Sequence, residues 1–420
     1  MKFISRDDLE SIQEKKVIDQ VNFAYANSPF YKRKFDEVGI EPKDIKSMDD
    51  FFEKVPLTSK EELIDSQLAH PPFGEFLSVP NEKIKLIFIS PGPIFEPHTE
   101  KDLQVLRNGL GKRIIDLGIG KSDVCQVTLS YHLMPAGFAI HMGAEAAGCT
   151  VIPAGTGESR MQADVMRKAG TTIYVGTPSF LARIAEKAEK MKIDPRRDLN
   201  LRMGICIAEP LPPSLRTNLQ RTFDIELFDV YGVAELGILA GECGEHDGMH
   251  VNEEDFIVEI IDPDTLERVR PGEEGEIVCT PLGREALPLI RYRTGDVSLI
   301  TFEKCKCGRE DARILGIRGR VGMLTKVKGV FIHPRQVGEV VEGYRELGRF
   351  QILVERPGIY DEMTIFVECK EIEKFEDWEE KLKEAFKEIL RIKCDVKMVH
   401  TGEIPPDVDV LEDRRGHYAE

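Results

Sequence analysis

The segment between Val124 and Pro178 constrains the fold most strongly, because short apolar runs alternate there with helical stretches. The runs VCQVTLS, TVIPAG and TTIYVGTPSF are separated by AGFAIHMGAEAAG and by a helical stretch through Met166. Strands that alternate with helices usually pair in parallel, which predicts a parallel or mixed sheet covered by helices on both faces. Ligands bind such sheets at the carboxyl ends of the strands, so the loop at residues 130–137 is expected to border a site.

The rest of the chain predicts two domains of different composition. A length of 420 residues exceeds what one hydrophobic core usually serves. Residues 1–80 have helical periodicity broken by turns, whereas alternating strands and a charged helix follow Arg318. The predicted fold is α/β: a large N-terminal domain (1–317) with parallel or mixed sheets covered by helices, then a small mobile α+β C-terminal domain (318–420). The charged helix carries apolar residues at the spacing of a core stripe: Phe375, Trp378, Leu382, Phe386 and Leu390.

Charge and cysteine usage exclude several classes of function. A formal net charge of −17 argues against non-specific binding to nucleic acids or to anionic membranes. No apolar run reaches membrane-spanning length, and the first ten residues have acids where a signal peptide needs an apolar core. Nine cysteines, an odd number, fit a reducing compartment better than a disulfide framework. The composition therefore predicts a cytoplasmic protein whose partners are small molecules.

The cysteine pattern between residues 243 and 307 predicts a metal site. Cys305 and Cys307 belong to a compact C-x-C-G turn, and Cys243 lies upstream with His246 and His250 close behind it. Three thiolates and one imidazole make a closed tetrahedral zinc site, which stabilises structure and leaves no position open for catalysis. The pattern leaves the choice of histidine open. The alternative is that surface thiols are adjacent by chance.

The stretch from Leu289 to Gly329 suggests a nucleotide-binding site. It begins with LIRYRTGD, which places Asp296 after a predicted Gly turn, and continues after a cysteine-containing insert with a Gly-Arg-x-Gly turn that contains Arg320. A carboxylate after such a turn can accept both hydroxyls of a ribose, and an arginine can hold a phosphate in a bidentate manner. The alternative is a salt-bridged hairpin without a ligand.

Four motifs together resemble the phenylacetate-CoA ligase branch of the adenylate-forming enzymes: YGVAE, LIRYRTGD, the C-x-C-G turn and KVKGVFIHPRQV. The resemblance extends over most of the chain and implies activation of a carboxylic acid with ATP and Mg²⁺, then transfer to CoA. It also implies a homodimer and favours His250 over His246, because the family's metal histidine lies in a G-[LM]-H step. By the same resemblance, Tyr131 and His132 occupy the aromatic wall of the acyl pocket.

The resemblance implies a nucleotide-binding role for six residues. Glu209 lies at the turn beside the adenine, and Tyr231 and Gly232 contact the adenine. Glu235 holds the magnesium ion. The family places a ribose contact at Asp296 and a phosphate-side contact at Arg320. The alternative for Tyr231 is that it packs into the core at the end of a strand.

The chain departs from the family where charge develops during catalysis. The family's phosphate loop is rich in Ser, Thr and Gly and contains a lysine, whereas this chain has SPGPIFEP at residues 90–97. Pro91 and Pro93 remove N–H donors, and Glu96 is predicted to stand in the place of the lysine. Without those donors the segment reads as an ordinary turn between a strand and a helix.

Other catalytic groups of the family are also missing. Ala234 replaces a hydroxyl residue, and Gly322, or Met323 in a shifted alignment, replaces the acidic hinge residue. The segment 402–416 contains no lysine where the family has a catalytic one. Losing one group that stabilises developing charge commonly costs two to three orders of magnitude in rate.

Two hypotheses follow, and they belong to different classes. In the first, the protein is an enzyme of the family that activates a carboxylate for CoA or adenylates a hydroxyl acceptor, as the similar deazaflavin-adenylating synthetases do. In the second, it is a non-catalytic relative or partner subunit that binds a nucleotide, an acyl-adenylate or a CoA thioester. The sequence leaves the catalytic residues and the acyl group unidentified.

Overall fold

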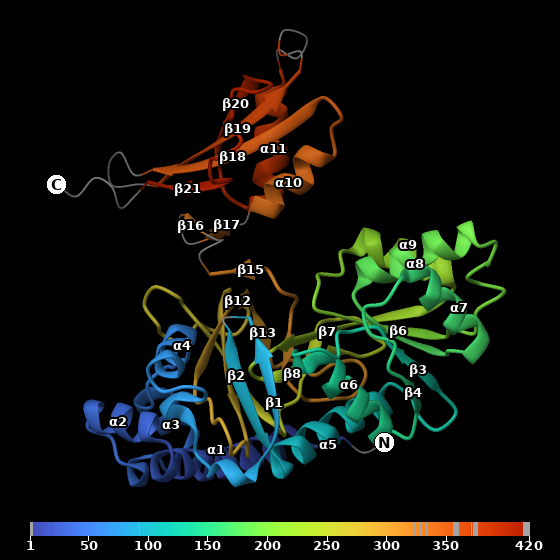
Figure 1. Ribbon diagram of the computed structural model, residues 1–420. Helices are drawn as coiled ribbons and strands as arrows, with labels where there is room; N and C mark the ends of the chain where they lie inside the picture. The colour runs from blue at the N-terminus through green and yellow to red at the C-terminus, as the bar shows by residue number, and fades with distance from the viewer. Residues whose placement is uncertain are drawn as a thin grey trace. The chain divides into compact units, whose positions relative to one another are not determined.

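The computed structural model describes residues 3–91, 93–321, 325–327, 330–332, 334–355, 361–370, 372 and 377–414. The chain divides into two compact units (Figure 1). Unit 1 comprises Met1–Asp262, Leu266–Thr294 and Leu299–Ile317, and unit 2 comprises Pro263–Thr265, Gly295–Ser298 and Arg318–Glu420.

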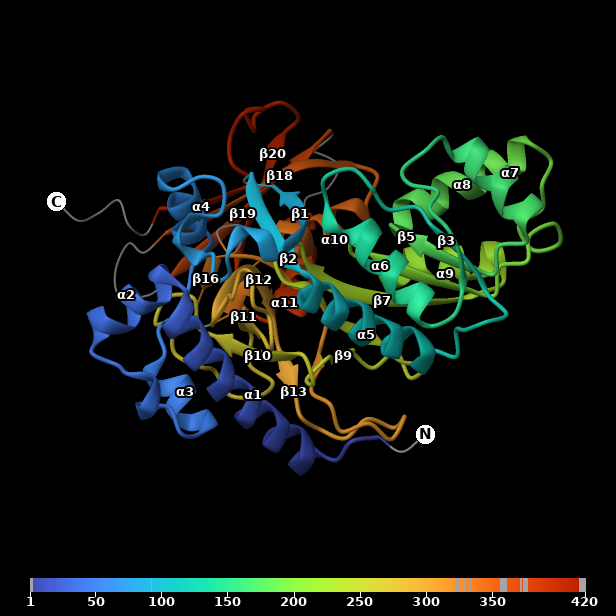
Figure 2. The ribbon, with the colours of Figure 1, turned by 60° about the horizontal axis from the view of Figure 1, so that its bottom comes forward.

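Unit 1 opens with four helices, each of which begins after a serine that caps it: α1 (Arg6–Asn27), α2 (Pro29–Val38), α3 (Met48–Lys54) and α4 (Lys60–Ala69). The capping hydroxyl accepts a hydrogen bond from a backbone N–H of the first turn, which otherwise has no partner. Leu9, Val17 and Val21 of α1 are buried. On the same helix, the side chain of Gln13 donates to the carbonyl of Phe256 at 3.0 Å, so α1 contacts the first residue of β10 (Phe256–Ile261) (Figure 2).

The largest sheet of unit 1 has nine strands in the order β13-β14-β9-β8-β7-β6-β5-β3-β4. Five of them pair in parallel: β3 (Val124–Val127), β4 (Thr150–Ile152), β5 (Ile173–Gly176), β6 (Met203–Ile207) and β7 (Glu226–Val233). The other four extend the sheet in antiparallel fashion: β8 (Gly237–Glu242), β9 (Met249–Val251), β13 (Ile300–Thr301) and β14 (Arg313–Ile314). The predicted mixed sheet is confirmed.

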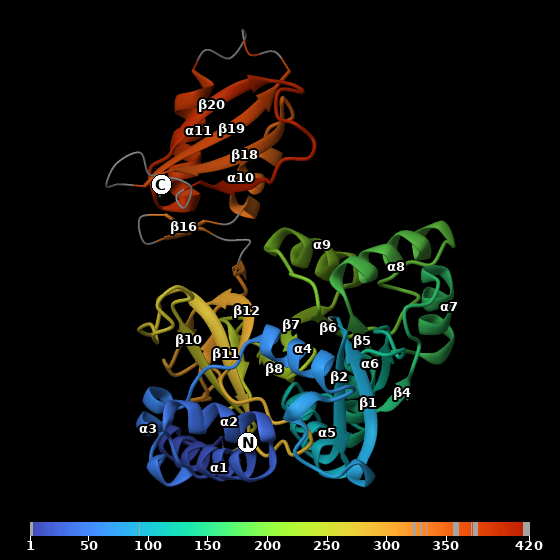
Figure 3. The same cartoon turned by 60° about the vertical axis from the view of Figure 1, so that its left-hand side comes forward.

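Helices cover both faces of the parallel strands (Figure 3). One face packs against α7 (Ser159–Ala169), α8 (Pro178–Lys190) and α9 (Pro213–Phe223), and the other against α5 (Glu100–Asp116) and α6 (Pro135–Ala146). Neighbouring strand residues point to opposite faces, so Cys206 joins the first core and Ile205 the second. A strand that is buried on both sides needs a continuous apolar run, which explains the composition of MGICI and IYVG.

Two smaller sheets complete unit 1. β1 (Ile84–Ser90) and β2 (Ile94–Thr99) form an antiparallel hairpin, and Thr99 caps α5 in a capping box with Asp102. The other sheet contains β10, β11 (Gly275–Pro281) and β12 (Tyr292–Ser298). The last residues of β12 belong to unit 2, where Asp296 pairs with Arg320 of β15 (Gly319–Arg320).

Unit 2 has its own core between two helices and a four-stranded sheet. The sheet order is β20-β19-β18-β21, formed by β18 (Leu347–Glu355), β19 (Glu362–Cys369), β20 (Asp395–His400) and β21 (Leu411–Asp413). α10 (Pro334–Glu342) and α11 (Trp378–Leu390) pack on it, and β16 (Thr325–Val327) pairs with β17 (Val330–Ile332). The expected stripe of α11 is buried at Leu382, Phe386 and Leu390, whereas Phe375 lies outside the described residues.

The predicted class, an α/β chain with a large unit and a small α+β unit, is confirmed by these sheets and helices. No helix among the described residues combines the length and the apolar run that crossing a bilayer requires.

Candidate functional site

Four side chains meet in a cluster of three thiols and one imidazole at the edge of the large sheet. The ligand atoms of Cys243, His250, Cys305 and Cys307 all lie within 4.8 Å of one another. Cys243 directly follows β8, His250 is the central residue of β9, and the other two cysteines lie between β13 and β14. β14 pairs with both β9 and β13, so these ladders join the two halves of the cluster.

Two distances within the cluster match the edges of a tetrahedral metal site. A tetrahedron with Zn–S bonds of about 2.3 Å and a Zn–N bond of about 2.0–2.1 Å has S···S edges of roughly 3.8 Å and S···N edges of roughly 3.5 Å. The Sγ atoms of Cys243 and Cys305 are 3.8 Å apart, and Cys307 Sγ is 3.5 Å from His250 Nε2. Burial lowers the pKa of His250 to about 4, which keeps its imidazole neutral, the form that binds metals. The Cys₃His set can therefore hold a metal ion.

The surroundings of the cluster separate the two candidate histidines. His250 Nδ1 is 3.7 Å from a carboxylate oxygen of Asp311, a group of the kind that orients a metal-bound imidazole. His246 instead contacts Glu226 at 3.0 Å and Glu242 at 3.1 Å. The structure thus groups His250 with the cysteines and leaves His246 in a polar cluster of its own.

The hairpin β1–β2 occupies the position of the expected phosphate loop. Ser90 pairs with Ile94, so only residues 91–93 connect the two strands. The prediction of a turn through residue 97 is wrong, because Ile94–Thr99 is a strand. Glu96 pairs with Phe88 inside this hairpin and is not part of the loop. Local sequence could not reveal this, since the strand forms through its pairing with β1.

Glu96 is fully buried, and its two carboxylate oxygens form no hydrogen bond of good geometry with the described residues, although the hydroxyl of Ser90 lies close enough to lower the pKa of Glu96. Burial raises the pKa of Glu96 to about 7, while the positive charge of Arg284 acts in the opposite direction. Glu235 also raises that pKa and Lys60 lowers it. Three charged side chains, those of Arg284, Glu235 and Lys60, therefore act on the carboxyl of Glu96.

Glu235 lies at the centre of that group. Its side chain is 3% exposed, and one oxygen accepts a hydrogen bond from Lys60 Nζ at 2.5 Å. Lys60 is the first residue of α4 and is 30% exposed. A carboxylate with this partner has one oxygen left for a second cation. Lys60 is 175 residues away in sequence, so nothing local signalled the pair.

The residues predicted to contact adenine lie on two neighbouring strand ends of unit 1. Tyr231 and Gly232 belong to β7, where the register with β8 shifts between them. The ring of Tyr231 is 8% exposed and belongs to the hydrophobic core, as the alternative interpretation expects. Glu209 follows β6 and accepts hydrogen bonds from the hydroxyl and the backbone N–H of Ser179, at 2.9 and 3.3 Å.

Asp296 and Arg320 face each other within unit 2. Arg320 Nε lies 3.2 Å from Asp296 Oδ1, and the two residues are paired across β12 and β15. Gly295 has a φ of +75°, but the predicted Gly turn is wrong, since β12 runs from Tyr292 to Ser298 without reversing. The ion pair agrees with the salt-bridged alternative and leaves the nucleotide role of both residues a prediction.

Tyr131 is half-buried and its hydroxyl lies 3.2 Å from His141 Nδ1, whereas His132 is exposed. Gly322 and Met323, the expected hinge positions, lie outside the described residues. The structure adds Arg284 and His98, which sequence reasoning missed. Both are buried and border a cavity next to Glu235.

Comparison with known proteins extends these observations. The model of the AMP-binding enzyme family matches residues 102–281, and that of the AMP-binding enzyme C-terminal domain matches residues 329–409. A phenylacetate-coenzyme A ligase of Thermus thermophilus is 32% identical over 377 residues, which are 88% of this chain and 83% of that protein. The Escherichia coli phenylacetate-coenzyme A ligase is 32% identical over 416 residues, 96% of this chain and 93% of that protein.

Solved structures show the same architecture. A 2-hydroxyisobutyryl-CoA ligase in an open conformation, in complex with 2-HIB-AMP and CoA, superimposes with a TM-score of 0.90 at 24% identity, covering 98% of this chain and 93% of that one. In the postadenylation state with 2-HIB-AMP the TM-score is 0.79 at 25% identity, and the match covers 99% of this chain and 92% of that one.

Proposed function

Because the chain belongs to the AMP-binding enzyme family, in its phenylacetate-coenzyme A ligase-like branch, we propose that it binds an adenylate or an acyl-coenzyme A ligand but adenylates carboxylic acids poorly. Relatives of this chain carry the name phenylacetate-coenzyme A ligase, and a solved neighbour holds an acyl-adenylate with CoA. Family membership thus supports an adenylate or an acyl-coenzyme A as the ligand. The departures in the phosphate loop argue against efficient use of ATP.

One observation carries the second half of this proposal. Only three residues connect β1 to β2, and Pro91 and Pro93 among them have no N–H to offer a phosphate. Glu96, the first carboxylate after the loop, is buried in β2. The negative charge of Glu235 raises its pKa. Two of the three connecting residues therefore offer no backbone donor to a polyphosphate, and none of the three is a lysine.

The six predicted nucleotide contacts keep their roles in this proposal. Glu209, Tyr231 and Gly232 would border the adenine, and Glu235 would approach the phosphate through a magnesium ion or through Lys60. In unit 2, the Asp296–Arg320 pair would separate, so that the carboxylate accepts the ribose hydroxyls and the guanidinium meets the phosphate. Glu209, Tyr231 and Gly232 lie at the carboxyl ends of β6 and β7, which supports their part of this assignment, since α/β sheets bind ligands there.

Zinc is the metal that we assign to the Cys₃His cluster. Soft thiolate ligands and the tetrahedral edge lengths support zinc over harder divalent cations. All four positions are filled by protein ligands, so the ion would join the loop after β8 to the loop after β13 and take no part in catalysis.

The division at residues 317 and 318 is part of the same proposal. Residues 318–420 would form the small domain that changes pose in this family. No lysine occurs between Gly402 and Gly416, where the resemblance places the catalytic one. The small domain would then supply no catalytic lysine to the reaction.

Titration calorimetry with AMP and with ATP–Mg²⁺ tests the proposal. We expect AMP to bind at least about tenfold more tightly than ATP, because the β- and γ-phosphates lose their hydration without gaining donors. Asp296→Asn should weaken AMP binding, whereas Asp395→Asn, an exposed aspartate of the same unit, should not. Equal or tighter binding of ATP would contradict the proposal.

Pyrophosphate exchange with a panel of aryl and aliphatic acids provides the kinetic test. The wild-type protein should stay near background with every acid. Robust exchange would overturn the proposal that the protein adenylates carboxylic acids poorly. The protein would then be an active ligase. If Lys60→Met then removed that exchange, Lys60 would be the cation that replaces the missing loop lysine.

A further inference from the structure

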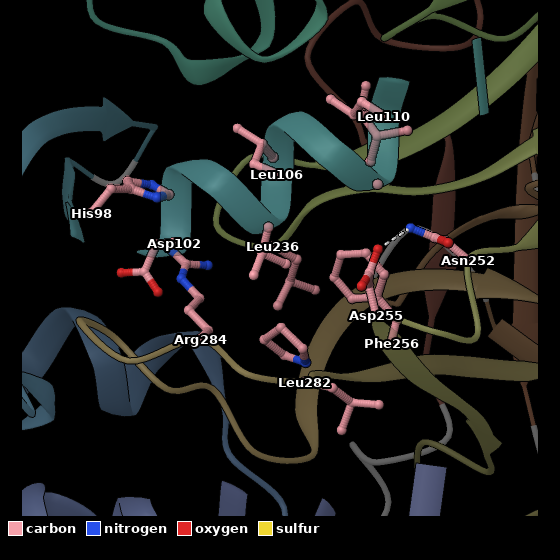
Figure 4. Close-up of a pocket in the computed structure, with 14 residues that line it drawn as sticks. His98, Asp102, Leu106, Leu110, Leu236, Asn252, Asp255, Phe256, Leu282 and Arg284 are labelled. Carbon is pink, nitrogen blue, oxygen red and sulfur yellow. Dashed lines mark hydrogen bonds between the residues drawn. The ribbon is translucent and has the colours of Figure 1, made fainter. Parts of the chain in front are cut away.

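A small pocket of unit 1 lies beside α5, with polar residues at both ends and apolar side chains between them (Figure 4). Its volume is about 50 Å³. Most of its wall is apolar and is formed by Leu106, Leu110, Leu236, Ile238, Phe256 and Leu282. Arg284 and His98 lie together at one end, opposite Asp255.

Arg284 is a buried cation with one free edge. It is 8% exposed, and Nη1 donates to the carbonyl of Glu235. Nε and Nη2 have no hydrogen-bond partner, and no carboxylate among the described residues forms an ion pair with this guanidinium. The N–H groups of Nε and Nη2 point the same way, as the fork that binds a carboxylate in a bidentate manner. A buried charge without such a partner is costly.

β2 presents two more groups of this kind. Glu96 and His98 alternate along the strand and therefore share one of its faces. His98 is 8% exposed, and its Nε2 has no hydrogen-bond partner in the described chain. Arg284 lies close enough to influence both side chains electrostatically. Three buried polar groups from two segments thus converge without bonding one another.

The acids in the cavity wall are already engaged. Asp102 accepts backbone N–H bonds from Thr99, Glu285 and Ala286, at 2.7–3.1 Å. Asp255, at the far end, accepts a hydrogen bond from the Asn252 amide at 2.7 Å. Neither carboxylate forms an ion pair with Arg284, whose Nε and Nη2 N–H groups therefore remain available to an anion.

We infer that this cavity binds a short monocarboxylate of about the size of acetate, with its carboxylate on Arg284 and His98 and its alkyl group against the leucines. The volume admits an ion of only a few heavy atoms. A planar carboxylate matches the guanidinium fork, and a methyl group matches the apolar wall. Phosphate would leave oxygens against the leucines without donors. This inference does not depend on the proposed nucleotide site.

Binding of ¹³C-labelled acetate to the full chain, followed by NMR in a carboxylate-free buffer, tests the inference. Chloride at equal ionic strength controls for screening. We expect saturable binding by the wild type and binding about 10- to 100-fold weaker in Arg284→Gln, which loses charge-assisted hydrogen bonds. Arg107→Gln removes the same charge from the exposed side of α5 and should leave the affinity unchanged.

A second variant covers the case in which Arg284→Gln disturbs folding through its bond to Glu235. Leu106→Phe keeps Arg284 and fills the cavity, and it should also abolish acetate binding without lowering the melting temperature. Acetate binding that survives Leu106→Phe, or that is absent from the folded wild type, would overturn the inference. Displacement of acetate by inorganic phosphate would overturn the assignment to carboxylates.

Discussion

At the residue scale, the chemistry of unit 1 depends on four ions that are largely removed from water. Lys60 pairs with Glu235 directly, whereas Arg284 acts on Glu96 through its charge and forms no ion pair with it. A buried charge without a close partner shifts its pKa until the neutral form is favoured. Glu96 follows this rule, since its pKa rises to about 7.

The pH dependence of stability tests this placement of Glu96. Its carboxyl stays protonated in the folded chain between its ordinary pKa of 4.5 and its folded pKa of about 7. The folded state then holds more protons than the unfolded state, so the free energy of unfolding falls as pH rises through that window. Glu96→Gln removes this loss and should be more stable than the wild type at pH 8, by up to about 3 kcal/mol.

Urea unfolding at pH 8 and below pH 5 measures the difference. The advantage of Glu96→Gln should disappear at the lower pH, where the wild-type carboxyl is protonated in both states. Glu82→Gln, at an exposed glutamate before β1, should show no such dependence. A variant that is less stable than the wild type at pH 8 would mean that Glu96 is ionised and well solvated in the fold.

At the element scale, one buried carboxylate joins α5 to the loop that carries Arg284. Asp102 closes the capping box with Thr99 and also accepts the backbone N–H groups of Glu285 and Ala286. Glu62 closes a similar capping box in α4 with Ser59, in a more exposed setting. Comparing the two separates the contribution of the cap from that of the loop.

Asp102→Ala should lower the free energy of unfolding by about 2–4 kcal/mol, because buried N–H donors lose their acceptor. Glu62→Ala, which removes a cap and an ion pair with Lys34, should cost about 1 kcal/mol. Chemical denaturation of both variants in the same buffer measures their free energies of unfolding. Equal losses would show that the contacts to Glu285 and Ala286 contribute nothing beyond capping.

At the scale of the whole molecule, the two units have separate cores and should unfold as separate transitions. The zinc ion assigned to the Cys₃His cluster belongs to unit 1. The only tryptophan of the sequence, Trp378, lies in α11 of unit 2 and packs against Tyr344. Its fluorescence therefore reports on unit 2 alone.

Elemental analysis should find one zinc per chain, and a chelator should lower the melting temperature of unit 1 by at least about 5 °C. Calorimetry follows unit 1, and the fluorescence midpoint of Trp378 should stay unchanged. Cys305→Ser should reproduce the effect of the chelator, whereas Cys149→Ser, outside the cluster, should not. A chain without metal, or a midpoint of Trp378 that moves with unit 1, would contradict this prediction.

The sequence by itself determined the features that depend on neighbouring residues. Alternating apolar runs predicted the mixed sheet, and the helical periodicity of residues 1–80 predicted the helices at the start of the chain. The C-x-C-G turn brought two thiols together, and the resemblance selected His250. Each of these signals is local, because period and chelating turns act over a few residues.

Only the tertiary structure decided which distant charges meet. Lys60 reaches Glu235 across 175 positions, and the pairing of β1 with β2 removes Glu96 from the loop and buries it. Arg284 faces a cavity whose walls come from five separate stretches of chain. No local pattern encodes these contacts, because burial and pairing between distant segments set the electric field in which each carboxylate, amine and guanidinium acts.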